Sequence, residues 1–130
     1  MIRLFAVAVF GLIPACQSDE TVAAYGAAEA TWTLVELNGA PFSERATLLF
    51  GEDGQVSGQA PCNRFTFTNG VPYPWFESGP IASTKMACPN LETEGAFFKS
   101  LSNMTQVVLA DGRMVMANDD GGEMVFIPVE

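Results

Sequence analysis

Short runs of β-favouring residues, separated by turn signals, fill the chain from Thr31 onward. Alternating apolar and polar residues within the runs, and Asn-Gly or Asp-Gly pairs between them, are typical of antiparallel strands joined by tight turns. One such turn is expected at Asn69-Gly70. The pattern predicts an antiparallel sheet or barrel. The expected strands cover residues 31–37, 46–50, 55–59, 65–68, 105–110, 113–117 and 123–129.

One segment has helical spacing. Asn90 can cap its start, and apolar side chains then recur every three or four positions. Pro72 and Pro74 forbid a central strand in residues 71–76, so that stretch is a loop or a sheet edge. We expect a mainly β fold: a small antiparallel β-barrel-like domain with one α-helix inserted before a C-terminal meander. The apolar positions of the helix are Leu91, Phe97, Phe98, Leu101 and Met104.

The first sixteen residues have the pattern of an export signal. Arg3 is followed by an apolar run from Leu4 to Ile13, which is too short to span a bilayer but matches the core of a secretory signal. Residues 13–16, Ile-Pro-Ala-Cys, resemble the bacterial lipobox, in which the cysteine is acylated and becomes the new N-terminus. The sequence therefore predicts a lipoprotein signal peptide at residues 1–15 and lipid attachment at Cys16.

The length of the chain bounds its domain organisation. Of its 130 residues, 130 − 15 = 115 remain after removal of the signal, which suits one compact domain. Residues 16–30 are polar and then alanine-rich, without a sustained apolar period. We expect them to form the lipidated cysteine and a flexible tether, with the folded domain at residues 31–130.

Charge and composition exclude several classes of function. The net charge is −9, and the basic residues are scattered, whereas binding to nucleic acid needs a concentrated basic surface. The chain has no histidine, which removes the commonest general base and the commonest metal ligand. We expect no nucleic-acid partner, no metal site, no cofactor and no enzymatic activity. The basic residues of the domain are Arg45, Arg64, Lys85, Lys99 and Arg113.

Two segments differ from generic strand sequence. They read G-Q-A-P-C-N-R-F at residues 58–65 and A-S-T-K-M-A-C-P at residues 82–89. In this order, and with the helix that follows, they resemble the META domain of bacterial HslJ-like heat-shock proteins and lipoproteins. The resemblance implies a small β-barrel-like fold in an envelope or stress-associated protein, without an established catalytic activity. The residues that match the family motifs are Gly58, Asn63, Arg64, Thr84, Met86 and Pro89.

Cys62 and Cys88 form an even pair once Cys16 is acylated. In an exported protein they face an oxidising compartment, so we predict a disulfide between them, the alternative being two buried free thiols. Asn63 and Thr84 are expected to serve turns and backbone hydrogen bonds beside the cysteines. Arg64 and Lys85 are either an anion-binding pair or part of an exposed strand face.

Tyr73, Trp75 and Phe76 are the candidate partner loop, because aromatic residues on a proline-stiffened loop can anchor a partner at low entropic cost. Equally, they can plug one end of the barrel. The acidic run at residues 118–123 has calcium-like composition but lacks the spacing of an EF-hand, which favours a solvated hairpin turn. Glu92 and Glu94 fall in the first turn of the helix, where the helix dipole favours negative charge, so their presence needs no catalytic explanation.

The sequence predicts a non-enzymatic envelope lipoprotein that supports envelope integrity or stress resistance through protein contacts. We expect a monomer, held on the outer membrane by its lipid and facing the periplasm, with an envelope protein as partner. Two alternatives remain open. One is a barrel whose mouth holds a small apolar ligand, and the other is an inhibitor of a hydrolase that attacks the envelope.

Overall fold

The computed structural model describes residues 19–129, so the predicted signal segment and Cys16 lie outside the described residues. Two short 3₁₀ helices, η1 (Val22–Tyr25) and η2 (Ala27–Glu29), precede the sheet, and one α-helix, α1 (Leu91–Asn103), interrupts it. The strands are β1 (Thr31–Leu37), β2 (Ala40–Pro41), β3 (Thr47–Phe50), β4 (Gln55–Gln59), β5 (Arg64–Thr68), β6 (Ala82–Ser83), β7 (Gln106–Ala110), β8 (Arg113–Ala117) and β9 (Glu123–Val129).

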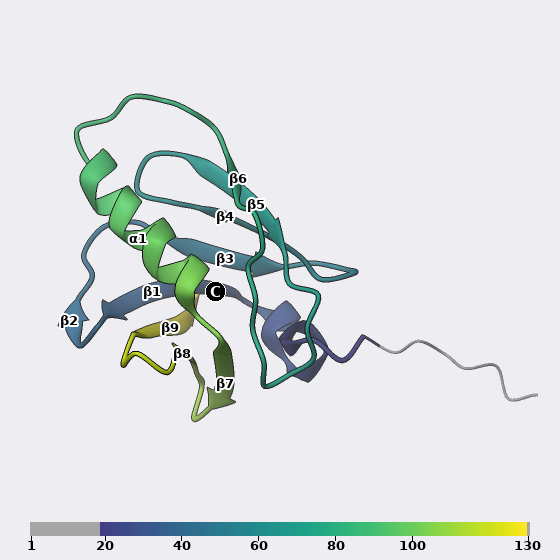
Figure 1. The fold of residues 1–130 in the computed structure, drawn as a ribbon. Helices are drawn as coiled ribbons and strands as arrows, with labels where there is room; N and C mark the ends of the chain where they lie inside the picture. The colour runs from purple at the N-terminus through teal and green to yellow at the C-terminus, as the bar shows by residue number, and fades with distance from the viewer. Residues whose placement is uncertain (1–18, 130) are drawn as a thin grey trace, which may run out of the picture.

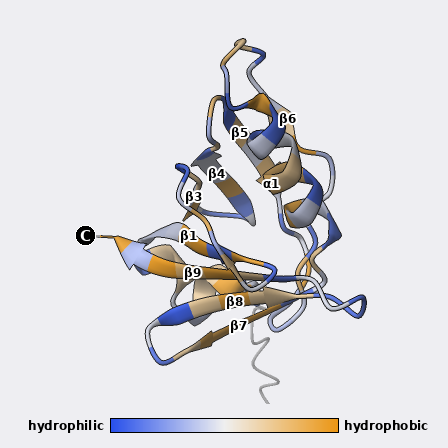
Figure 2. Cartoon of the chain, turned by 90° about the vertical axis from the view of Figure 1, so that its left-hand side faces the viewer, coloured by the Kyte–Doolittle hydropathy of each residue, from blue (hydrophilic) through white to orange (hydrophobic). Residues whose placement is uncertain are grey.

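All the strands belong to one antiparallel sheet in the order β6-β5-β4-β3-β1-β9-β8-β7, with β2 paired to β1. Strand β1 occupies the middle because β9, the last strand, returns to pair with it. The sheet is strongly bent, and α1 lies in the angle between β3–β6 and β7–β9 (Figures 1 and 2). The predicted fold class is confirmed, although β6 and β7 do not pair, so the sheet is barrel-like without being closed.

Three hairpin turns have the predicted chemistry. At Asn38-Gly39, Asp53-Gly54 and Asp111-Gly112 both residues have positive φ, which Asn, Asp and Gly tolerate best. The turn predicted at Asn69-Gly70 is wrong. Asn69 is buried, its N–H donates to the Gly54 carbonyl, and it opens a long connection to β6 instead of a hairpin.

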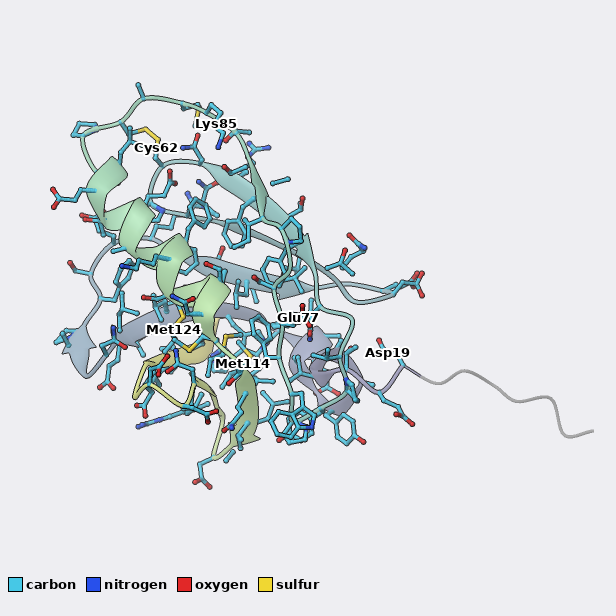
Figure 3. The ribbon with its side chains drawn as sticks, viewed as in Figure 1. Asp19, Cys62, Glu77, Lys85, Met114 and Met124 are labelled. Carbon is cyan, nitrogen blue, oxygen red and sulfur yellow. A yellow bond between two sulfur atoms is a disulfide. The ribbon has the colours of Figure 1, made fainter. Side chains whose placement is uncertain are left out.

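The core fills the angle between the sheet and α1. Inward-facing side chains of every long strand belong to one buried cluster with Phe97 and Leu101 of the helix, and four methionines, Met104, Met114, Met116 and Met124, are part of it. Met114 and Met124 are seen there in Figure 3. Leu91, the first of the apolar positions predicted for the helix, is exposed. Within residues 19–129, no helix has the length and apolarity that crossing a membrane requires.

Residues 19–30 are part of the folded domain, which corrects the tether predicted for them. Val22 and Ala27 are fully buried in the core, and the Trp32 indole N–H donates to the Ala27 carbonyl over 2.9 Å. The sequence of this segment hides its packing, because small alanines and one valine carry it without an apolar period. The described fold thus already includes Asp19, which is three residues after Cys16 in the sequence.

Candidate functional site

The two family motifs meet at the side chain of Asn63, which lies in the turn between β4 and β5 and is 3% exposed. Its Oδ1 accepts hydrogen bonds from the Thr84 hydroxyl over 2.9 Å and from the Met86 N–H over 2.7 Å. Its Nδ2 donates to Glu94 Oε2 over 2.7 Å and to the Met86 carbonyl over 3.4 Å. Every hydrogen-bonding position of the amide is thereby used within the chain. The role expected for Asn63 and Thr84, hydrogen bonding beside the cysteines, agrees with this geometry.

Glu94 of α1 is the acceptor on which this network converges. Its Oε1 accepts from the Cys62 N–H over 3.0 Å and from the Asn63 N–H over 2.6 Å. The carboxylate is 4% exposed, and its three hydrogen bonds attach the helix to the β4–β5 turn. The role expected from sequence, favourable charge in the first helical turn, therefore describes only part of what Glu94 does.

Burial by itself would raise the pKa of Glu94, because it penalises the charged form. The hydrogen bonds from the Asn63 N–H, the Asn63 side chain and the Cys62 N–H act in the opposite direction, and so does the nearby Lys85 ammonium. Together they outweigh burial, so the pKa of Glu94 is lowered from its ordinary value. The network is therefore built around an ionised carboxylate.

The disulfide predicted between Cys62 and Cys88 is confirmed, with the two Cα atoms 6.0 Å apart. It joins the β4–β5 turn to the segment between β6 and α1, at the end of the molecule marked by Cys62 and Lys85 in Figure 3. Disulfide and amide network thus hold the same two segments. We interpret this end of the domain as a covalent and hydrogen-bonded clamp.

The remaining motif residues have separate positions. Gly58 lies where β4 approaches β3 so closely that a Cβ would collide with the Thr47 carbonyl. Met86 contributes its backbone to the clamp, while its side chain is exposed, and Pro89 precedes the helix. Asn90 follows it and is the N-cap residue, as predicted, but its side chain makes no capping hydrogen bond: its Nδ2 donates to the Pro61 carbonyl over 3.0 Å.

A groove of about 580 Å³ is lined by residues of β1 and β3–β6. The register places Thr66 beside Ser57, Ser57 beside Leu49, and Leu49 beside Thr31. These residues alternate with core side chains along their strands and therefore face outward. Leu49 is 46% exposed in the groove. Arg64 also lines the groove, and Lys85 Nζ donates to the hydroxyl of Ser83, another lining residue, over 3.2 Å.

The candidate partner loop divides between the two roles left open for it. Phe76 is buried in the core against Phe67, with the ring centroids 5.9 Å apart. Tyr73 is half-buried and stacks on Tyr25, whereas Trp75 is exposed. The backbone of the loop covers the edge of β7: the Val107 N–H donates to the Pro74 carbonyl, and the Phe76 N–H to the Thr105 carbonyl. The loop therefore mainly covers the edge of β7.

Sequence reasoning missed Glu94 as the centre of the clamp. A signal was present, because Glu94, Phe97 and Leu101 are spaced as one face of a helix, and this is the buried face. A carboxylate on an apolar helix face needs buried donors. The acidic run at 118–123 forms the predicted turn, in which Asn118 Oδ1 accepts from the Asp120 and Gly122 N–H groups.

Comparison with known proteins supports the same architecture. The META domain family model matches residues 26–130. A protein solved by NMR is 22% identical over 78% of this chain and 90% of its own, with a TM-score of 0.62. A protein from Burkholderia xenovorans, also solved by NMR, is 22% identical over 83% of this chain and 87% of its own, with the same TM-score.

A crystal structure of a DUF4847 family protein from Bacteroides vulgatus is more distant. It is 17% identical over 82% of this chain and 96% of its own, with a TM-score of 0.57. At these identities the likenesses establish a shared fold. No curated protein matches the sequence.

Proposed function

The chain belongs to the META domain family, and from that premise we propose that it is a non-enzymatic binding domain of the bacterial envelope, held there by a lipid on Cys16. In this proposal it supports envelope integrity or stress resistance by contacting another envelope protein. The observation that carries it is the groove on the outer face of the sheet. Half-exposed Leu49 supplies an apolar contact there, and the threonine hydroxyls around it supply hydrogen bonds.

The hydrogen bonding of the motif residues favours binding over catalysis. The polar side-chain atoms of Asn63 and Glu94 form hydrogen bonds within the chain, and these bonds hold the clamp together. These two residues therefore stabilise the fold, and we assign partner binding to the outer surface of the sheet. The two alternatives have less support: core side chains fill the interior where a barrel ligand would lie, and the candidate inhibitor loop is bonded along β7.

A matched pair of charge substitutions tests the groove. Leu49 and Val108 are both 46% exposed on strands, but only Leu49 lines the groove. Leu49→Asp should abolish cross-linking of the anchored protein to its envelope partner, because a carboxylate in an apolar contact must be desolvated. Val108→Asp should leave the cross-link intact. Both variants should melt within a few degrees of the parent, since exposed substitutions cost little stability.

If the two variants cross-link equally well, the partner does not bind in the groove. If the parent protein yields no specific cross-link in intact cells, the binding proposal fails. Catalytic turnover of a substrate by the purified domain would overturn the non-enzymatic role.

The lipid anchor has its own test. Cys16→Ser should block incorporation of labelled fatty acid and leave the protein unprocessed or released from the membrane, because the thiol is the site of acylation. The membrane fraction and the mass of the mature N-terminus report the result. Unchanged lipid labelling in this variant would contradict the proposed anchor.

A further inference from the structure

Tyr25 and Tyr73, whose rings stack, and Trp75, two positions further along the same loop, make up what we call the aromatic face. Tyr25 is 59% exposed and Trp75 is 54% exposed. The rings of Tyr25 and Tyr73 stack with their centroids 4.6 Å apart and their planes inclined by 19°. The backbone of Trp75 bridges to Gln106 at the edge of β7. Two of the three aromatic residues are therefore more than half exposed, and each carries a polar group on an apolar ring.

The aromatic face adjoins the start of the folded chain. The Tyr73 N–H donates to the Glu20 carbonyl over 2.7 Å, and Tyr25 itself lies in η1. The Tyr73 hydroxyl accepts from the Leu109 N–H over 3.2 Å, which fixes the loop against β7. Figure 1 shows η1, the loop and β7 on the same side of the molecule. Tyr73 is thus bonded directly to a residue four positions after Cys16.

The length of chain between Cys16 and the domain limits how the domain can stand on a membrane. Three Cα-to-Cα steps separate Cys16 from Asp19, so the connection reaches at most about 11 Å. A domain of this size has a radius of gyration of about 13 Å. Because the connection is shorter than the domain is wide, the side that carries Asp19 and Glu20 must face the bilayer that holds the lipid.

We propose that the aromatic face rests in the headgroup region of that bilayer. This inference depends on the proposed acylation of Cys16. Tyr and Trp prefer the membrane interface because their rings are apolar and their polar atoms stay hydrated. Asp19 and Glu20 lie beside the face and would repel anionic lipid, so the surface it fits is one of zwitterionic headgroups.

Tryptophan fluorescence can test the contact, since the structure describes one buried tryptophan, Trp32, and one exposed tryptophan, Trp75. The acylated protein is placed on phosphatidylcholine vesicles containing lipids brominated near the headgroup, which quench only nearby indoles. The emission of Trp75, taken as the difference between the parent and Trp75→Phe, should be largely lost. As a matched control, Ala87→Trp in the Trp75→Phe background reports from the exposed end near the disulfide and should keep its emission.

The same protein without its lipid, Cys16→Ser, should show no quenching of Trp75 at equal vesicle concentration. The mass of each preparation establishes whether Cys16 is acylated. If acylated protein leaves Trp75 unquenched, or quenches position 87 equally, the inference is overturned while the anchor stands. If the native protein carries no lipid, the proposed anchor fails, and coupling Cys16 to a maleimide lipid still decides the geometry by the same quenching.

Discussion

Gly58 is the residue whose identity the backbone restricts most directly. A Cβ there would meet the Thr47 carbonyl and lie 2.6 Å from the Phe65 ring, both inside the packed sheet. Gly58→Ala should therefore lower the free energy of unfolding by about 1 to 3 kcal/mol, measured by urea denaturation. Gly95→Ala is the control: a Cβ on this helical glycine has no atom within 4 Å, so it should stabilise by about 0.5 to 1 kcal/mol. A neutral Gly58→Ala would contradict the close approach of β3 and β4.

Glu94 makes the stability of the domain depend on pH. Its lowered pKa in the folded chain means that the ionised form is stabilised by folding. This contribution is complete above the pKa of the unfolded chain, near 4.3, and is lost as the pH falls through the lower folded value. Glu94→Gln should destabilise the domain at neutral pH by about 1 to 3 kcal/mol, because an amide cannot accept from both backbone N–H groups and Asn63 Nδ2.

The test compares urea denaturation at pH 7 and at pH 3. The difference in free energy of unfolding between the parent and Glu94→Gln should be smaller at the lower pH. Protonation of Glu94 in the parent removes the same negative charge that the substitution removes. Glu92→Gln, on an exposed position in the same helical turn, should match the parent at both values. If this difference is the same at pH 7 and at pH 3, the stabilisation does not depend on the charge of Glu94.

The motif residues illustrate what sequence can reveal about single positions. Asn63 and Thr84 could be assigned to backbone hydrogen bonding because their side chains commonly satisfy turns. The partner of Asn63 could not be predicted, since Glu94 is 31 positions away in the sequence. How close the two side chains come depends on how α1 packs against the β4–β5 turn. The missing information was tertiary, and only the spacing of Glu94 from Phe97 and Leu101 pointed to it.

At the scale of elements, long strands were predictable and short ones were not. Strands β1, β4, β8 and β9 have the predicted bounds, and in β1 and β8 buried residues alternate with more exposed ones, which is a strong signal. Strands β2 and β6 have two residues each and exist only because a neighbouring strand offers a partner. The same holds for residues 71–77, whose bonds to β7 no local pattern could specify.

The loop over β7 should respond very differently to the loss of its two neighbouring aromatic side chains. Phe76→Ala should cost about 3 to 5 kcal/mol, because it leaves a cavity beside Phe67 in the core. Trp75→Ala should change the free energy of unfolding by less than about 1 kcal/mol, since its side chain is half exposed. Thermal melting of the two variants checks this, and similar losses would contradict the division of roles within the loop.

At the scale of the whole molecule, one antiparallel sheet with one helix was predictable, but its N-terminal boundary was not. The pairing of β9 with β1 brings the two ends of the domain together, and the core then extends to Val22. Burial of that residue depends on elements more than 80 positions later, so composition alone suggested a tether. If Cys16 is acylated as proposed, the shorter connection holds the domain close to the membrane surface, whereas a flexible tether would let it move away from the membrane.

The disulfide is the feature whose removal should affect the entire domain. It closes a chain segment with a sequence separation of 26, so loss of the bond should lower the free energy of unfolding by about 3 to 4 kcal/mol through the freedom gained by the unfolded chain. The variant Cys62→Ala with Cys88→Ala isolates this effect in denaturation experiments. Dithiothreitol should lower the stability of the parent to that of the variant and leave the variant unchanged. Two titratable thiols at positions 62 and 88 in the unreduced exported protein would contradict the bond, and equal stability of parent and variant would show that the hydrogen bonds of Asn63 and Glu94 hold the clamp without it.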